Sequence, residues 1–245
     1  MSLHDFVTQG LLNYTPLRHR ATRKRFVHAR RRAFEAVRST RYSRPGHDGI
    51  DAKLERHLPS TGVFVEAGAN DGYTWSNTYF LERFRNWHGV LIEGIPALSE
   101  ECRRLRSRST VYNCALVGPD YAEPYVTMTY SDLRSLITGS EQQMEQQALA
   151  ATAAPYKVRV LARTLDDVLQ DAGVKCVDFI SLDLEGLEAP ALRGLDFERH
   201  SPTWLLVEIA AGGGRQAVEA VLGSDYEAVE ELTPGDVLYH RRGRP

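Results

Sequence analysis

Four acidic residues follow apolar runs that are short enough to be buried strands. They are Glu66, Glu93, Asp183 and Glu208. In an open parallel sheet the ligand site lies beyond the carboxyl ends of the strands, so these side chains are expected along one edge. Four carboxylates at one edge are unfavourable unless they meet cations or hydrogen-bond donors. An acid at a strand end can also cap the following helix. A binding site nevertheless explains the four acids better than four separate helix caps would.

The turn after the first of these strands reads Gly68-Ala69-Asn70-Asp71-Gly72. A glycine turn after a strand lets the backbone approach a ligand closely. The G-x-G-x-x-G pattern of a dinucleotide site is not met, because its second and third glycines are Asn70 and Tyr73. Asp71 also places a negative charge where a pyrophosphate would lie. The turn therefore favours a nucleoside ligand without phosphate, and a cationic one fits best.

Three of the carboxylates suggest particular roles. Glu93 stands 25 residues after Gly68, where a carboxylate can bind the ribose hydroxyls of a nucleoside. Asp183 and Glu208 end neighbouring strands, and Mg²⁺ prefers a few carboxylates plus water. Glu185 is the next candidate, as a third ligand or as a base, although an acid there could simply stabilise the start of a helix.

Strands and helices alternate through most of the chain. Strands are expected at 62–66, 89–93, 110–114, 177–183 and 204–208, and a closing antiparallel hairpin at 226–231 and 236–241. Helices are expected at 76–86, from Pro96 onward, at 165–171 behind the cap Thr164, and at 187–193. This order predicts an α/β fold with a mostly parallel, Rossmann-like sheet of seven strands and helices on both faces. Between these segments, 125–130 suggests a strand and 140–154 a helix or a lid.

Length and composition limit the protein class. The chain has 245 residues with 42% hydrophobic and 25% charged residues, which suits one soluble domain with an extension. No apolar run approaches the ~20 residues of a membrane span, and no signal peptide is evident. Three cysteines without CxxC spacing argue against a disulfide frame or a zinc knuckle. We therefore expect a cytoplasmic protein, either an enzyme or a binding domain.

The charge is distributed unevenly. Residues 17–44 hold eleven Lys or Arg against one acid, Glu35, and the remainder has a formal charge of −12. We therefore divide the chain into a basic helical extension (1–45) and a main domain (46–245). Phe26, Phe34 and Val37 fall near helical spacing, so the extension can dock as an amphipathic helix with its arginines in solvent. It could instead contact a partner or a second copy of the chain, or bind an anionic surface.

Two segments resemble the FkbM-type S-adenosylmethionine-dependent methyltransferases. They are 63–72 (VFVEAGANDG) and 177–188 (VDFISLDLEGLE), and 164–167 and 192–194 also fit. The resemblance covers about residues 60 to 240. It implies a class I methyltransferase sheet and S-adenosylmethionine as cofactor. The cofactor-binding positions that it implies are Glu66, Ala67, Gly68, Asn70, Asp71, Glu93, Gly94, Asn113, Cys114, Ala115 and Asp183.

The similarity is greatest to a subgroup that methylates sugars, such as the 1-hydroxyl of a mannose derivative. A sugar hydroxyl is a poor nucleophile, because its pKa lies well above neutral, and needs a base or a metal. The predicted function is thus O-methylation of a small sugar or oligosaccharide by direct in-line displacement. Asp183, Glu208 and Glu185 are the catalytic candidates, with Mg²⁺ on Asp183 and Glu208. Tyr73, Trp75 and Tyr130 are candidate sugar platforms, each of which could equally be a core residue.

Two other functions stay open from the sequence. Asp183-Leu184-Glu185 mimics the acid-x-acid metal motif of nucleotide-sugar glycosyltransferases. That reading leaves the glycine turn and Glu93 without a role. A non-catalytic methyltransferase-like scaffold could use the basic extension instead. Nucleic acid is an unfavoured partner, because the body of the chain is acidic and has no N/D-P-P-aromatic motif.

Overall fold

The computed structural model describes residues 20–131, 134–137, 156–209 and 212–243. Contacts divide the chain into two compact units, Met1–Arg44 and Pro45–Pro245. None of the helices in the described ranges is long and apolar enough to cross a membrane.

The first unit contains the basic helix that the sequence predicts, α2 (Arg20–Ala36). The chain reverses after this helix. The ring of Tyr42 then meets Phe34 edge to face, with 4.7 Å between centroids. The Arg30 guanidinium lies 3.9 Å from the centroid of the same Tyr42 ring, within the range of a cation–π contact. Val37 lies beyond the helix and is exposed, so it takes no part in an apolar stripe.

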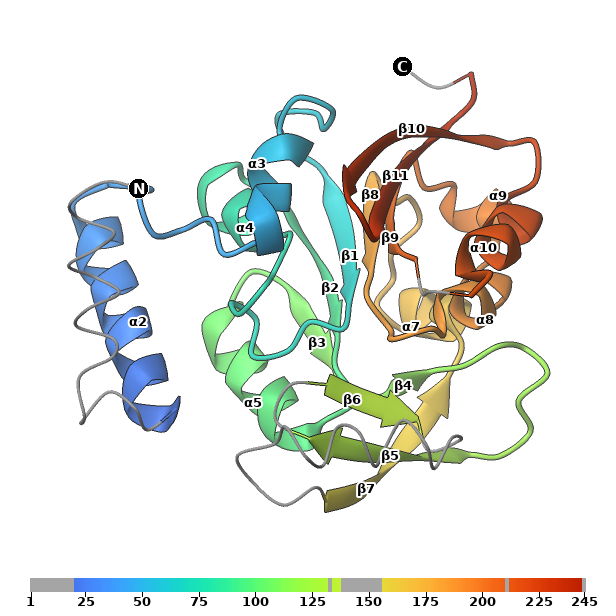
Figure 1. The fold of residues 1–245 in the computed structure, drawn as a ribbon, viewed down its shortest axis with the longest axis horizontal. Helices are drawn as coiled ribbons and strands as arrows, with labels where there is room; N and C mark the ends of the chain where they lie inside the picture. Colours follow the sequence, from blue (N-terminus) through green and yellow to red (C-terminus); the bar gives the residue numbers. More distant parts are fainter. Residues whose placement is uncertain (1–19, 132–133, 138–155, 210–211, 244–245) are drawn as a thin grey trace. The chain divides into compact units, whose positions relative to one another are not determined.

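The second unit is built on a seven-stranded sheet in the order β10-β11-β9-β8-β1-β2-β3 (Figure 1). The five parallel strands are β1 (Val63–Ala67), β2 (His88–Ile92), β3 (Thr110–Tyr112), β8 (Phe179–Leu182) and β9 (Trp204–Glu208). The antiparallel hairpin is β10 (Tyr226–Thr233) and β11 (Asp236–Arg241), and β11 pairs with β9. The predicted fold class is confirmed, since this is a mostly parallel, Rossmann-like sheet of seven strands with an antiparallel hairpin at one edge.

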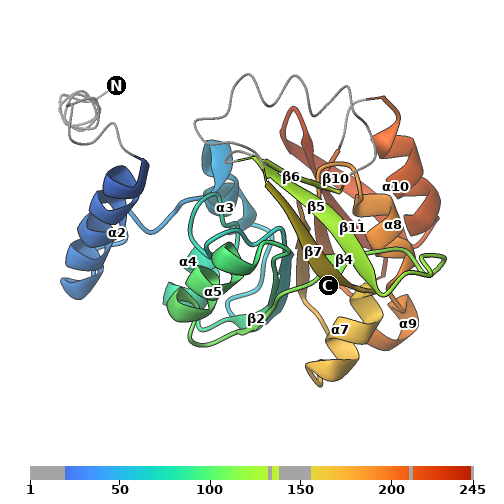
Figure 2. The same ribbon diagram turned by 90° about the horizontal axis from the view of Figure 1, so that it is seen from below.

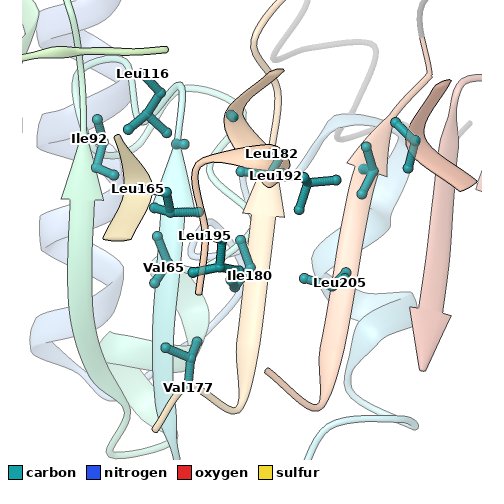
Figure 3. Close-up of a cluster of buried hydrophobic side chains, with 14 of the residues drawn as sticks. Val65, Ile92, Leu116, Leu165, Val177, Ile180, Leu182, Leu192, Leu195 and Leu205 are labelled. Atoms are coloured by element: carbon teal, nitrogen blue, oxygen red, sulfur yellow. The ribbon is translucent and has the colours of Figure 1, made fainter. Parts of the chain in front are cut away.

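Helices cover both faces of this sheet (Figure 2). On one side lie α3 (Ile50–Leu54), α4 (Tyr79–Phe84) and α5 (Pro96–Leu105), preceded by the short 3-10 turn η2 (His47–Gly49). On the other lie α7 (Leu165–Asp171), α8 (Glu188–Arg193), α9 (Phe197–His200) and α10 (Gly214–Leu222). The strands alternate between the two cores, because successive side chains point to opposite faces. Val65 and Ile180 join the α7/α8/α10 core (Figure 3), whereas Phe64 and Phe179 join the other.

A second sheet was not predicted. It contains β4 (Ala115–Leu116), β7 (Tyr156–Arg163), β5 (Tyr125–Ser131) and β6 (Arg134–Ile137), in that order. Only β5 was expected from the sequence as a strand. Ile95, Val126 and Val160 form part of a small core that joins this sheet to the turn after β2. The small sheet therefore lies at the carboxyl ends of the large sheet's parallel strands (Figure 1).

Several element boundaries differ from expectation by a few residues, and two of these differences have local reasons. The third strand ends at Tyr112, because the Asn113 side-chain amide turns to donate to the carbonyls of Glu93 and Gly94. The helix expected from residue 76 begins at Tyr79. Thr78 therefore holds the N-cap position in place of Ser76, although the Ser76 hydroxyl accepts from the Tyr79 N–H at 3.0 Å. The helix or lid expected at 140–154 falls outside the described residues.

Candidate active site

A cleft opens between the carboxyl ends of β1, β2 and β8 and the inner face of the small sheet. Its lining is Gly68, Asn70, Thr74, Trp75, Ile92, Glu93, Gly94, Leu98, Cys114, Ala115, Leu116, Met128, Tyr130, Asp183, Leu184, Glu185 and Leu187. This is the edge at which a parallel sheet binds ligands. The predicted residues Gly68, Asn70, Glu93, Gly94, Cys114, Ala115, Asp183 and Glu185 thus come together in one place.

Two glycines let the walls of the cleft approach each other. A Cβ on Gly68 would stand 2.1 Å from the carbonyl oxygen of Asp183, and Gly68 has a φ of +86°. A Cβ on Gly94 would stand 2.4 Å from the Met128 sulfur. Real Cβ atoms do not come this close to other heavy atoms. Only glycine therefore allows β1 to approach the end of β8, and β2 to approach the small sheet.

Glu93 closes the end of β2 and is 6% exposed. Its carboxyl oxygens accept from the backbone N–H of Asn70 at 2.8 Å and of Ile95 at 2.7 Å. Burial raises the pKa of Glu93 to about 7, although these backbone hydrogen bonds pull it down. The group therefore changes its protonation close to neutral pH, at a place where a ligand's hydroxyl groups could stabilise its charged form.

Asp183 and Glu208 meet at the ends of the neighbouring strands β8 and β9. Their side chains share a hydrogen bond, and the pKa of Asp183 is raised well above its ordinary value, first by burial and then by the charge of Glu208. Glu185 and Asp236 add further negative charge. Burial and the facing charge of Glu208 thus make Asp183 a better proton acceptor than an ordinary carboxylate.

Glu185 lies in the cleft wall with a φ of +54°, a conformation that non-glycine residues rarely adopt. The turn that carries it is fixed by Glu188. The Glu188 carboxylate accepts from the backbone N–H of Leu184 at 2.8 Å and of Gly186 at 3.1 Å. Glu188 therefore fixes the backbone of the turn 184–186 through these two hydrogen bonds, and Glu185 lines the cleft from that turn.

Four predicted cofactor residues and one predicted catalytic residue do not line the cleft. They are Glu66, Ala67, Asp71, Asn113 and Glu208. Glu208 acts on the cleft through Asp183. The Asp71 carboxylate accepts from the Tyr73 and Thr74 N–H groups and the Thr74 hydroxyl, so it folds the loop after β1. The carboxyl groups in this set are thus used inside the protein rather than turned toward the cleft.

Several lining residues were not anticipated from the sequence. Met128 reaches the cleft on β5, and Thr74, Leu98, Leu184 and Leu187 come from segments beside the predicted ones. Met128 carried no sequence signal, because the small sheet that brings it over Gly94 was not recognised. Thr74 and Leu184 could have been found, since each directly adjoins a predicted residue in the sequence.

The predicted metal site consists of two carboxylates. In the described ranges no group of three or more His, Cys, Asp or Glu side chains is arranged to hold a metal ion. Mg²⁺ can nevertheless be held by one or two carboxylates together with water and substrate oxygens. The Asp183–Glu208 pair has that donor chemistry, and its mutual repulsion favours a bound proton or cation.

Comparison with known proteins identifies the family. The profile of the Methyltransferase FkbM domain matches residues 66–232, about two-thirds of the chain. The chain belongs to the FkbM methyltransferase family. The resemblance to the FkbM-type methyltransferases that the sequence predicted is thus confirmed.

Solved structures of similar fold include three methyltransferases. Methyltransferase FkbM from Methylobacillus flagellatus is 16% identical, with a TM-score of 0.49 over 85% of this chain and 52% of that one. The present FkbM chain thus spans about half the length of that protein. A TehB-like methyltransferase from Corynebacterium glutamicum is 11% identical, with a TM-score of 0.44 over 91% and 100% of the two chains. An O-methyltransferase from Bacillus cereus, in complex with S-adenosylhomocysteine, is 12% identical, with a TM-score of 0.41 over 79% of each. No curated protein matches the chain.

Proposed function

We propose that this FkbM-family protein methylates a hydroxyl group of a sugar or oligosaccharide. The observation that carries the proposal is the Asp183–Glu208 carboxyl pair, which adjoins the same cleft as Gly68 and Glu93. The cleft would thus offer a nucleoside-binding end and, next to it, a group that can take a proton from an acceptor.

At the nucleoside end, Glu93 would accept hydrogen bonds from the ribose hydroxyls in its charged form. The close approach at Gly68 leaves the backbone of the loop after β1 against the ligand. Cys114, Ala115 and Leu116 supply a mostly apolar wall suited to an adenine ring. S-adenosylmethionine, when bound there, supplies an electrophilic methyl group on a positively charged sulfur.

At the acceptor end, Asp183 would act as the general base. A base acts best when its pKa approaches the working pH, and burial with the neighbouring charge of Glu208 moves the pKa of Asp183 in that direction. The acceptor hydroxyl would donate to the Asp183 carboxylate and lose its proton to it as the oxygen bonds to the methyl carbon. The bond between that methyl group and sulfur would break, and S-adenosylhomocysteine would be the leaving group. Glu208 would keep Asp183 oriented through their shared hydrogen bond, and Glu185 would add to the negative field.

Magnesium assistance is part of the proposal. When the ion is present, Asp183 and Glu208 would hold it in place of a proton, and Glu185 would take the acceptor's proton instead of Asp183. The ion would supply Lewis acidity that favours the deprotonated acceptor oxygen.

The sugar acceptor is supported by the aromatic side chains around the cleft. Trp75 is 49% exposed at the lining, and Tyr130 lines it from the small sheet. Sugars stack on such rings with their apolar faces and use carboxylates for their hydroxyls.

Calorimetric titration with S-adenosylhomocysteine, with and without Mg²⁺, is the first test. We expect micromolar binding in both conditions. Methyl transfer from labelled S-adenosylmethionine to methyl mannosides and methyl glucosides would then identify the acceptor class. Activity on a sugar that survives excess EDTA would remove magnesium from the proposal. Binding without transfer to any sugar, but with transfer to an amine, would remove the hydroxyl acceptor.

A further inference from the structure

One arginine is enclosed behind the loop that forms a wall of the cleft. Arg106, just after α5, is 1% exposed. It does not line the cleft. Its Nε donates to Glu82 at 2.9 Å, and its Nη1 lies 3.5 Å from Glu66. The guanidinium thus joins the end of β1 to α4 through two buried carboxylates.

The same guanidinium contacts the loop itself. Nη1 donates to the Gly72 carbonyl and to the Ser76 hydroxyl, both at 3.1 Å, and Nη2 donates to the Thr78 hydroxyl at 2.8 Å. A Cβ on Gly72 would stand 2.8 Å from Cγ of Arg106, so the loop backbone packs directly on this side chain.

Glu66 binds the same loop as the guanidinium. Its carboxyl oxygens accept from the Ser76 hydroxyl at 2.8 Å, the Asn77 N–H at 2.7 Å and the Thr78 hydroxyl at 2.6 Å. All of these donors belong to the segment 76–78. Glu66, which the sequence suggested as a cofactor ligand, therefore uses its carboxylate to hold the loop.

The loop needs such a restraint. Gly68, Asn70, Gly72 and Trp75 have φ values of +86°, +51°, +80° and +61°, and two of these residues are not glycine. Backbone in this region persists only where the surroundings fix it. The same loop also lines the cleft, through Gly68, Asn70, Thr74 and Trp75.

We propose that Arg106 is a positioning residue of the methyl-transfer site, which holds the loop 68–78 in the shape that binds the cofactor. A buried ion pair contributes little net stability compared with apolar side chains of the same volume, because its desolvation offsets its attraction. The planar guanidinium instead holds its N–H donors in fixed directions, so that they reach α4 and three positions of the loop at once. The inference rests on the proposed cofactor site, since it assumes that the cleft binds the nucleoside.

The test uses Arg106→Lys in the full chain, which keeps the charge but loses the fork of donors. We expect the dissociation constant of S-adenosylhomocysteine to rise about tenfold or more. Hydrogen exchange should accelerate at the amides of residues 70–78 and remain unchanged in β8 and β9. A merely structural role would instead accelerate exchange throughout the sheet and leave affinity unchanged in the folded fraction.

Arg85→Lys is the matched control, because Arg85 also pairs with a carboxylate, Glu55, at 2.7 Å but does not contact the loop. Its affinity should stay within about twofold of the wild type. If Arg106→Lys does not fold, Thr78→Val removes one hydroxyl that contacts both Arg106 and Glu66, and the same local exchange with about a threefold loss of affinity is expected.

Unchanged affinity and unchanged loop exchange in the folded variant would overturn the inference. If the wild type itself does not bind S-adenosylhomocysteine, the cofactor proposal fails. Hydrogen exchange at residues 70–78 in Arg106→Lys then still shows, independently of cofactor binding, whether Arg106 orders the loop.

Discussion

The carboxyl groups at the two ends of the cleft have different surroundings. At the β1–β2 end, Glu66 and Glu93 are buried and each accepts two or more hydrogen bonds from the protein. At the β8–β9 end, Asp183 faces other acids, Glu208 and Asp236 among them. The first end is organised before a ligand arrives, whereas the second holds negative charge that a proton, a cation or an acceptor must neutralise. In the proposed function, binding and chemistry thus belong to different ends of one sheet edge.

The largest effect is expected from Asp183→Asn. An amide cannot take the acceptor's proton, and general-base catalysis contributes about 10²–10⁴-fold, so turnover should fall by that amount. The affinity for S-adenosylhomocysteine should stay within a few-fold, because the nucleoside end is intact. Single-turnover methyl transfer and calorimetry check the two parts. Asp120→Asn, at an exposed loop position, is the matched control and should change neither. Near-normal turnover in Asp183→Asn would contradict the assignment of chemistry to this end.

Gly68→Ala tests the nucleoside end. The new methyl group would meet the Asp183 carbonyl oxygen at 2.1 Å, so the loop or β8 must move. We expect loss of measurable binding and a drop in the free energy of unfolding of about 3 kcal/mol or more. Gly173→Ala is the control, since Gly173 has a similar φ of +67° with nothing within 4 Å of its Cβ position. That variant should lose only about 1–2 kcal/mol and bind normally. Equal losses in the two variants would show that backbone strain, and not the close approach, limits the site.

The sequence predicted the nucleoside end better than the acceptor end. β1, β2 and their turns are contiguous apolar runs with glycines, so local pattern was enough to find Gly68, Asn70 and Glu93. The role of Glu66 was not visible, because its partner Arg106 is 40 residues away and ordinary in its local sequence. The small sheet was missed for a similar reason. Its strand β7 pairs with β5 across a long separation, and only that pairing brings Met128 and Tyr130 to the cleft.

A smaller effect, dependent on pH, is expected at Glu93. Its pKa of about 7 lies above the ordinary value, so the unliganded protein is partly protonated there near neutral pH. Ribose hydroxyls favour the carboxylate, so the affinity for S-adenosylhomocysteine should rise as the pH increases through 7, by up to about tenfold per pH unit below it. Calorimetry in buffers of different ionisation enthalpy should detect proton release on binding. In Glu93→Gln the affinity should be lower and the pH dependence lost.

The stability of the unliganded protein should show the opposite trend. The raised pKa means that the folded state binds this proton more tightly than the unfolded chain does. The stabilisation is therefore complete below about pH 4.5 and lost as the pH rises through about 7, by at most about 3 kcal/mol. Glu93→Gln, compared with the wild type by urea unfolding at several pH values, isolates this contribution. If the difference in unfolding free energy between the wild type and Glu93→Gln does not change between pH 5 and 8, Glu93 stays charged in the absence of a ligand.

The smallest effect is expected at Trp75, and it separates the two ends most directly. Trp75 belongs to the loop that holds the cofactor end, yet its ring is half-exposed and edge-on to His47, with 6.2 Å between centroids. If the ring serves the acceptor, Trp75→Ala should raise KM for an accepted methyl glycoside by up to about tenfold, the size of one aromatic contact, and leave the affinity for S-adenosylhomocysteine unchanged. Trp75→Phe should recover most of the loss, since it keeps a flat apolar face. If both variants instead lose cofactor affinity, the site requires the left-handed backbone at this position and not the ring. The loop would then belong wholly to the nucleoside end.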